Sequence, residues 1–222
     1  MKTLIVFAHP ERNSFNGAML DTAKTVLKTP GNEVKISELN QMGFDPLSNR
    51  SNFKTVKDND YFKPQVEEKH ASENDGFAED VETEIQKIEW CDLMIWQFPL
   101  WWFSLPAVLK GWVDRTFVMG RVYGMGKIYD TGAFKGKRAL LSLTTGGPEP
   151  AYNKGGFNGD IDSILKPIQR GMLKFTGFDV LSPHIVYGAA QLSDDERKVK
   201  LVQFQTRLEN IVKEHAIEVL EY

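Results

Sequence analysis

The sequence predicts an α/β fold in which helices cover both faces of a doubly wound, five-stranded parallel sheet, a three-layer sandwich. Two short apolar runs, at residues 4–8 and 93–98, are typical of strands that are buried on both faces. Segments with helical spacing separate the expected strands, and parallel strands need such crossovers. The 222 residues are enough for one core and no Gly/Ser-rich linker divides them, so we expect a single domain over residues 1–222.

The first strand, at residues 4–8, leads into a turn-prone stretch at 9–16 and then into a helical pattern that reaches Leu27. Ser14 or Asn13 can cap this helix. The N–H groups of its first turn then face the carboxyl end of the strand, where an anion would be stabilised. We therefore expect a phosphate group to bind here.

The next segments predict a more peripheral strand and a long connection. Residues 33–39 alternate between polar and apolar, as in a strand with one exposed face. Residues 40–76 are polar and predicted to be an irregular loop region. Because structureless loops of this size are uncommon, the segment is functional, ordered by a partner, or contains a short helix around residues 65–71. Residues 77–90 then show helical spacing.

The stretch from residue 93 to 106 concentrates more apolar and aromatic surface than any other. A buried strand at 93–98 ends at Pro99, which removes a ladder donor. Residues 101–103 are Trp-Trp-Phe, and a helix over 106–117 follows. In open α/β sheets ligands bind at the carboxyl ends of the strands, so this aromatic loop is a candidate for binding.

A glycine pair follows another expected strand, at residues 137–143. The sequence there is Thr144-Thr145-Gly146-Gly147, and glycine lets backbone N–H groups approach a flat or charged ligand closely. The glycine-rich segment 120–127 does not fit a phosphate-binding P-loop, because that motif requires glycine at its first position, where Arg121 stands, and Ser or Thr at its last.

The last third of the chain predicts a helix over 160–175, a fifth strand broken at Pro183, and a final helix. Pro167 must kink the first of these helices or lie near its start. Ser193 begins a capping box, from which the last helix runs to about His215. The order of elements is that of a flavodoxin-like sheet.

Three strand ends should therefore line one crevice, namely residues 9–16, 99–103 and 144–147. The first suits a phosphate and the other two suit a planar ring, a combination that a flavin provides. Lys+Arg 27 against Asp+Glu 30 gives no support to a nucleic-acid or acidic-membrane partner. The single cysteine, Cys91, fits a reducing compartment, and no targeting segment is visible, so we expect a cytoplasmic protein. The four histidines lack ligand spacing, so we expect no metal site.

At these residues the chain resembles the NAD(P)H:quinone oxidoreductase family, the DT-diaphorase-like flavoproteins. The similarity runs from about residue 2 to 215 and is carried by segments 9–16, 97–103 with 106–112, 141–147, Tyr152, and 158–160 with 167–169. The resemblance implies non-covalent FAD, two-electron ping-pong transfer from NAD(P)H to a quinone through flavin N5, and a homodimer whose subunits share each active site.

The resemblance also implies roles for individual residues. Tyr152 would donate toward flavin N1/O2, with Asn158, Gly146 and Gly147 beside it. The implied cofactor-binding residues are His9, Ser14, Phe15, Asn16, Pro99, Leu100, Trp101, Trp102, Phe103, Thr144, Thr145, Gly146, Gly147, Tyr152 and Arg197. The implied substrate-site residues are Trp102, Phe103, Tyr123 and Met125.

Two positions depart from the pattern of many family members. Asn158 stands where some have a histidine that relays a proton, and Met125 stands where a second tyrosine often occurs. Two other functions fit the same fold: an FMN-dependent azo- or nitroreductase, and a flavin-binding regulatory subunit of a potassium efflux system. A one-electron flavodoxin-type carrier fits less well, because carriers usually dock through a strongly acidic face and this chain has a net charge of only -3.

Overall fold

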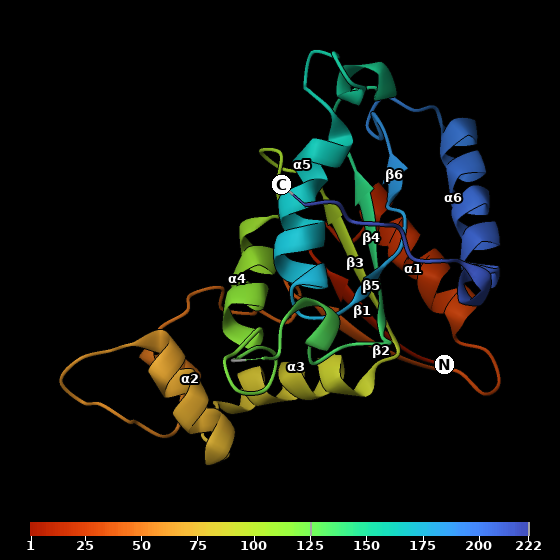
Figure 1. The fold of residues 1–222 in the computed structure, drawn as a ribbon. Coiled ribbons are helices and arrows are strands. Elements are labelled where there is room, and N and C mark those ends of the chain that lie inside the picture. Colours follow the sequence, from red (N-terminus) through yellow and green to blue (C-terminus); the bar gives the residue numbers. More distant parts are fainter. Residues whose placement is uncertain (125, 222) are drawn as a thin grey trace.

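The computed structural model describes residues 1–124 and 126–221, and in them six strands form one parallel sheet (Figure 1). The order across the sheet confirms the predicted doubly wound fold. From one edge to the other the strands are β2 (Glu33–Glu38), β1 (Lys2–Phe7), β3 (Leu93–Pro99), β4 (Arg138–Thr144) and β5 (Asp179–Val180), with β6 (His184–Val186) also paired to β4.

The far edge of the sheet is a strand in two pieces, as the sequence predicts. β5 pairs with the start of β4, Arg138 opposite Asp179, and β6 pairs with its end, Ser142 opposite His184. Pro183 lies between the two pieces. Proline has no N–H to donate to a ladder, so the pairing is interrupted there and resumes after it.

Helices cover both faces of the sheet and give three layers (Figure 1). Side chains alternate between the faces: Ile5 and Ile95 pack against one pair of helices, whereas Leu4 and Met94 pack on the opposite face. On the first face lie α1 (Phe15–Leu27) and α6 (Asp194–Glu209), and on the second α3 (Glu79–Trp90), α4 (Ala107–Thr116) and α5 (Ile161–Ile168).

The centre of the second face is an aromatic cluster. Trp96 of β3 and Trp112 of α4 meet edge to face with ring centroids 6.1 Å apart, and Phe117 contacts both. Both tryptophans are buried, as is Phe98. Each such side chain contributes about 1.5–3 kcal/mol by burial alone.

The segment 40–76 contains the short helix that was one of the predicted alternatives, α2 (Pro64–Glu73). Proline at its first position fits, because that N–H would have no partner in any helix. In Figure 1, α2 and the loops around it project to one side of the sheet. A buried guanidinium, that of Arg115, anchors this projection by donating to Asn52 Oδ1 (2.8 Å) and to the carbonyl of Asp45 (2.9 Å).

The predicted helix over 160–175 has two parts with different pitch. α5 ends at Ile168 and continues as a π-helix over Gln169–Lys174, so the structure places the change one residue after Pro167. A proline that lacks its N–H disturbs the regular hydrogen-bond ladder, and a wider turn is one way to relieve this. The capping box at Ser193 is confirmed, but α6 ends at Glu209, short of the predicted His215.

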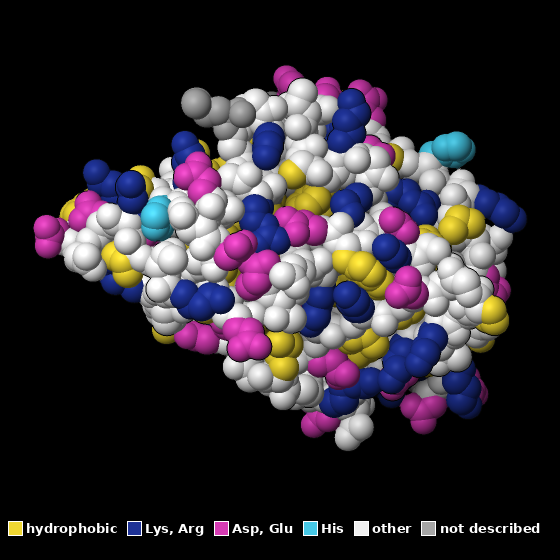
Figure 2. All heavy atoms as spheres, turned by 90° about the horizontal axis from the view of Figure 1, so that it is seen from below, with side chains coloured by type: hydrophobic (Ala, Val, Ile, Leu, Met, Phe, Trp, Pro, Cys, Tyr) yellow, Lys and Arg dark blue, Asp and Glu magenta, His cyan; other side chains and the backbone are white. Residues whose placement is uncertain are grey.

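The surface below α2 and α3 carries charges of both signs. In Figure 2, Lys and Arg side chains alternate there with Asp and Glu. Within residues 1–124 and 126–221 we find no helix with the length and apolarity needed to cross a bilayer.

Candidate functional site

A cavity of about 620 Å³ opens at the carboxyl ends of β1, β3 and β4. Its volume lies in the range of about 300–1,000 Å³ that is typical of sites for cofactors and small ligands. Most of the predicted cofactor residues line it, namely His9, Ser14, Phe15, Asn16, Pro99, Leu100, Trp101, Thr144, Thr145, Gly146 and Arg197. The structure thus brings together residues as far apart in the chain as His9 and Arg197.

The floor of this cavity is a chain of buried polar side chains. Gln97 Nε2 donates to Asn16 Oδ1 (2.8 Å), and Asn16 Nδ2 donates to Thr144 Oγ1 (2.9 Å). All three side chains are almost fully buried, so each must be satisfied internally. The chain ties α1 to β3 and β4 and fixes the orientation of Asn16.

One end of the cavity is suited to an anion. Ser14 caps α1 and accepts from the N–H of Gly17, while the N–H groups of Phe15 and Asn16 precede any intrahelical partner. The first turn of α1 has no acidic residue. Arg197 at the start of α6 lines the same cavity, and it is held by donating to the carbonyls of Ala189 (3.4 Å) and Ala190 (3.3 Å). This end therefore combines helix-terminal donors with a cation.

The strand end at β4 is held so that its glycines remain close to the cavity. Thr145 Oγ1 donates to the carbonyl of Gly147 (2.8 Å), and Gln191 Nε2 donates to the carbonyl of Gly146 (3.2 Å). Across the described residues, no hydrogen bond uses the N–H groups of Gly146 and Gly147. These two donors are thus available to a ligand.

The aromatic loop after β3 is a tight two-residue turn. Trp101 and Ser104 exchange backbone hydrogen bonds of 3.1 and 3.0 Å, and the residues between them have φ of 50° at Trp102 and 58° at Phe103. Such turns normally contain Asn and Gly, because positive φ is costly for bulky residues. Trp102 is also 95% exposed. Strain and exposure together make this turn a candidate binding position.

Tyr152 lies against this turn and close to Gly147. A hollow of about 310 Å³ is lined by Leu100, Trp101, Trp102, Phe103 and Tyr152. A Cβ built on Gly147 would lie 3.3 Å from the Tyr152 ring and 3.2 Å from Asn158 Nδ2, so the three positions adjoin. The structure thus groups the predicted residues Tyr152, Asn158, Gly146 and Gly147.

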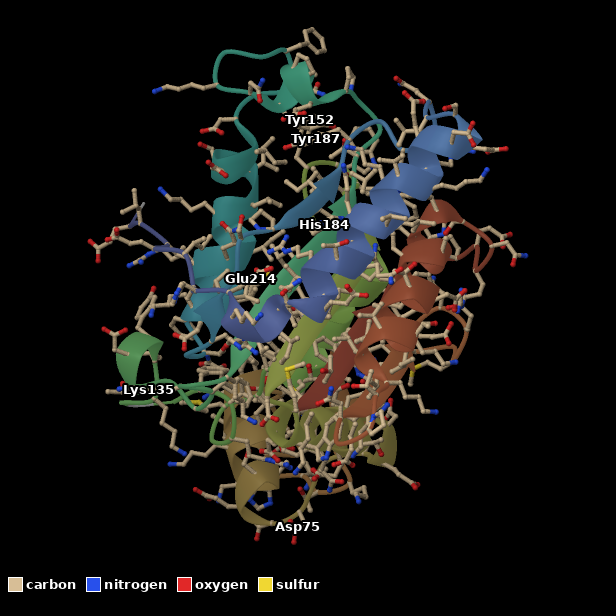
Figure 3. The ribbon with its side chains drawn as sticks, turned by 90° about the vertical axis from the view of Figure 1, so that its right-hand side faces the viewer. Asp75, Lys135, Tyr152, His184, Tyr187 and Glu214 are labelled. Atoms are coloured by element: carbon tan, nitrogen blue, oxygen red, sulfur yellow. The ribbon has the colours of Figure 1, made fainter. Side chains whose placement is uncertain are left out.

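A second tyrosine, Tyr187, lies beside Tyr152 (Figure 3). Their ring centroids are 5.8 Å apart. Burial raises the pKa of Tyr187, and the negative charges of Glu149 and Asp162 raise it further. Tyr187 packs against the ring of Tyr152 and limits where that ring can move.

Tyr123 lies apart from these residues. It lines a different cavity, of about 440 Å³, together with Glu68, Phe117 and Phe175. Burial raises the pKa of Tyr123, and the nearby Glu68 carboxylate raises it further. Within one chain the structure does not bring Tyr123 to the other predicted site residues, and Met125 falls outside the described residues.

Sequence reasoning missed several residues around the larger cavity. Gln97 is the one polar residue in a buried apolar strand, which could have marked it as a support for the site. Gln191, by contrast, lies in an ordinary loop sequence and carries no such signal. Ala189, Lys198 and Leu201 line the cavity from the α6 side, and only the fold brings them there.

Comparisons with known proteins agree with this geometry. A family model described as the flavodoxin-like fold matches residues 1–211. A ribosyldihydronicotinamide dehydrogenase (quinone) of Mus musculus is 43% identical over 97% of this chain and 94% of its own length. An NAD(P)H dehydrogenase (quinone) 1 of Cavia porcellus is 43% identical over 95% of this chain and 77% of its own.

Among solved structures, a candidate quinone reductase from Klebsiella pneumoniae superposes with a TM-score of 0.91 at 34% identity, covering 98% of this chain and 87% of that one. These similarities extend over almost the whole chain, including all three strand ends that form the large cavity. The chain therefore belongs to the NAD(P)H:quinone oxidoreductase family, with its flavodoxin-like fold.

Proposed function

We propose that this protein is an FAD-dependent NAD(P)H:quinone oxidoreductase that works as a homodimer by a ping-pong mechanism. The observation that carries the proposal is the convergence of three strand ends on one cavity of about 620 Å³. One end of that cavity offers anion donors and a cation, and the other offers aromatic walls beside two free backbone N–H groups. The family membership and the names of the relatives support quinone reduction by NAD(P)H.

The shape of the cavity supports FAD rather than FMN. FMN ends at a single phosphate, which the N-terminus of α1 would bind, whereas FAD continues through a pyrophosphate to an adenosine. The cavity continues in the same way, past α1 to Ala189, Ala190, Lys198 and Leu201 beside α6. That extension gives the second half of a dinucleotide a place to bind.

The residues of the chain have distinct parts in this scheme. A bound flavin would supply the redox chemistry, which is two-electron transfer from the nicotinamide to the quinone. Tyr152 would donate a hydrogen bond from its phenol where negative charge develops, and the N–H groups of Gly146 and Gly147 would add backbone donors. Asn158 can hydrogen-bond there but cannot titrate near neutral pH. Trp102 and Phe103 would line the planar ring and limit the access of water to it.

A homodimer accounts for the position of Tyr123. Its cavity and the hollow beside Tyr152 are separate in one chain, and both are open at the surface. Two copies facing each other would let Tyr123 and Phe175 of one subunit complete the acceptor site of the other. The same contact would cover Trp102 and Phe103, which are 95% and 50% exposed in the single chain.

The test begins with the flavin, which is released from purified protein and identified by chromatography. FAD-loaded protein is then mixed anaerobically with NADH or NADPH while the flavin absorbance is followed. We expect rapid two-electron bleaching that benzoquinone reverses without a semiquinone. Protein that binds no flavin after addition of FAD would contradict the proposal.

The two alternative functions give different results in the same experiment. Release of FMN, with faster turnover of azo or nitro compounds than of quinones, would identify an azo- or nitroreductase. Bound FAD that neither nicotinamide reduces, together with co-purification of a membrane protein, would identify a regulatory subunit of a potassium efflux system.

A further inference from the structure

Side chains on one face of α2 form hydrogen bonds with the loop that carries Tyr123. Glu68 accepts from the N–H of Met119 (2.8 Å), and Ser72 Oγ donates to the carbonyl of the same residue (2.8 Å). Gln65 Nε2 donates to the Tyr123 hydroxyl (3.2 Å). The spacing of three and four residues puts these side chains on one side of the helix. α2 therefore holds the loop at both its start and its tyrosine.

Among the three α2 residues that hold the loop, Gln65, Glu68 and Ser72, only Glu68 is charged. Its side chain is only 8% exposed, and it lines the cavity of about 440 Å³ with Tyr123 and Phe175. The Tyr123 hydroxyl donates to Glu68 Oε2 at 3.4 Å, while it accepts from Gln65. The single proton of the phenol is thus directed at the carboxylate.

The other charges on this cavity largely cancel each other. Lys110 and Asp114 line it from α4 and form an ion pair of 2.6 Å. Burial raises the pKa of Glu68, but the bonds from the Met119 N–H and Tyr123 favour its ionised form. Within the described residues, no cation pairs with Glu68, so the lining carries one uncompensated negative charge.

We propose that Glu68 is a specificity-determining residue for the electron acceptor, and that its carboxylate disfavours anionic acceptors relative to neutral ones. A buried charge is poorly screened, so a sulfonate or carboxylate entering this cavity meets repulsion that a neutral ring does not. Glu68 also acts through Tyr123. Because the Tyr123 hydroxyl donates its proton to Glu68, it can only accept a hydrogen bond from a ligand. The inference rests on the proposed function, because the cavity must complete the acceptor site of the partner subunit.

The test compares kcat/KM for a neutral naphthoquinone with that for a naphthoquinone sulfonate. In ping-pong kinetics kcat/KM for the acceptor reports only the oxidative half-reaction, and the ratio between two acceptors cancels changes that affect both. In Glu68→Gln we expect the ratio of kcat/KM for the neutral quinone to that for the sulfonate to fall roughly fivefold. This is the size expected when one partly buried charge near the ligand is removed. Glu73→Gln, an exposed residue on the same helix, is the control for net charge and should leave the preference unchanged.

A second variant separates charge from structure. Glu68→Asp keeps the charge but shortens the side chain. It should therefore retain the preference even if the hydrogen bond to the Met119 N–H is weakened. An unchanged ratio in Glu68→Gln, or the same fall in Glu68→Asp, would overturn the inference while wild-type turnover leaves the proposed function standing. Wild-type protein that reduces neither quinone would instead overturn the proposed function and the inference with it.

Discussion

Asn158 and Tyr152 meet beside Gly147, and only one of them can exchange a proton. Asparagine holds its charge state at every physiological pH, so we expect the rate of flavin reduction to vary little between pH 6 and 8. In Asn158→His a group with an ordinary pKa of about 6.5 enters the site, and a new pH dependence should appear in that range. Stopped-flow reduction at several pH values measures it. A profile that stays the same in the variant would show that position 158 takes no part in proton balance.

The phenol of Tyr152 is the titratable side-chain donor that we assign to the site. In Tyr152→Phe the ring and its contact with Tyr187 remain, but the hydrogen bond that we propose for the phenol cannot form. Removing one such donor usually slows a reaction about 100-fold or more, and here the backbone N–H groups of Gly146 and Gly147 should reduce the loss to about tenfold. Rapid mixing with NADH measures the step. Tyr187→Phe is the matched control, and an equal loss there would argue against a specific role for Tyr152.

His184 gives a prediction about stability. Its ring stacks on Phe204 at 4.5 Å beneath α6, and its Nε2 is buried without a partner among the described residues (Figure 3). Burial lowers its pKa to about 4, and the positive charges of Arg207 and Lys200 act in the same direction. The folded protein therefore resists a proton that the unfolded chain accepts below about pH 6.5.

Stability should then fall as the pH decreases from about 6.5 to 4, by up to about 3 kcal/mol from this group alone. Urea denaturation at a series of pH values measures the free energy of unfolding. His184→Leu removes the group and should flatten this part of the profile relative to wild type. Equal slopes in the two proteins would assign the acid sensitivity to other residues.

At the level of elements, the Trp102-Phe103 turn should trade stability for function. Replacing the pair with Asn-Gly supplies the residues that a turn with two positive φ angles prefers. We expect the double variant to be more stable by about 2 kcal/mol, since each strained position costs about 1–3 kcal/mol. Its kcat/KM for quinones should fall. Thermal melts and steady-state assays test both parts, and a less stable variant would show that the aromatic side chains, not the backbone, determine the energy of the turn.

The sequence predicted the elements well where one interaction dominates. Apolar runs located β1, β3 and β4, and the capping patterns at Ser14 and Ser193 located two helix starts, because burial and capping act locally. The change to a π-helix after Pro167 could not be located in advance, since several local adjustments relieve a proline equally well. α2 remained only an alternative, because its mainly polar sequence is stabilised by side chains that reach the loop at Met119.

In the candidate site, too, the features set by local sequence and topology could be predicted, whereas those set by long-range packing could not. The three strand ends could be assigned to one crevice from topology alone, and the structure places them there. The separation of Tyr123 from Tyr152, and the contribution of Ala189 and Lys198 to the cavity, depend on how distant segments pack. No local pattern encodes such contacts.

At the scale of the whole molecule, shared active sites can be tested by mixing two inactive proteins. Gly147→Leu would block one side of the site, because its side chain would meet Tyr152 and Asn158. Tyr123→Arg would block the side that we assign to the partner. In a mixed dimer one site carries both substitutions and the other carries neither, so activity should return after the subunits exchange. Activity that stays absent, while each variant alone remains folded and dimeric, would contradict sharing.

The buried chain of Gln97, Asn16 and Thr144 has a use in spectroscopy. Primary amides that are locked in hydrogen bonds and shielded from water exchange their protons slowly. Nitrogen-15 labelling should therefore give separate, persistent side-chain resonances for Gln97 and Asn16, at chemical shifts unlike those of surface amides. Because Asn16 also lines the large cavity, titration with FAD should shift its signals. The signals of these two amides would then report whether the cavity is occupied, and the ligand itself would need no label.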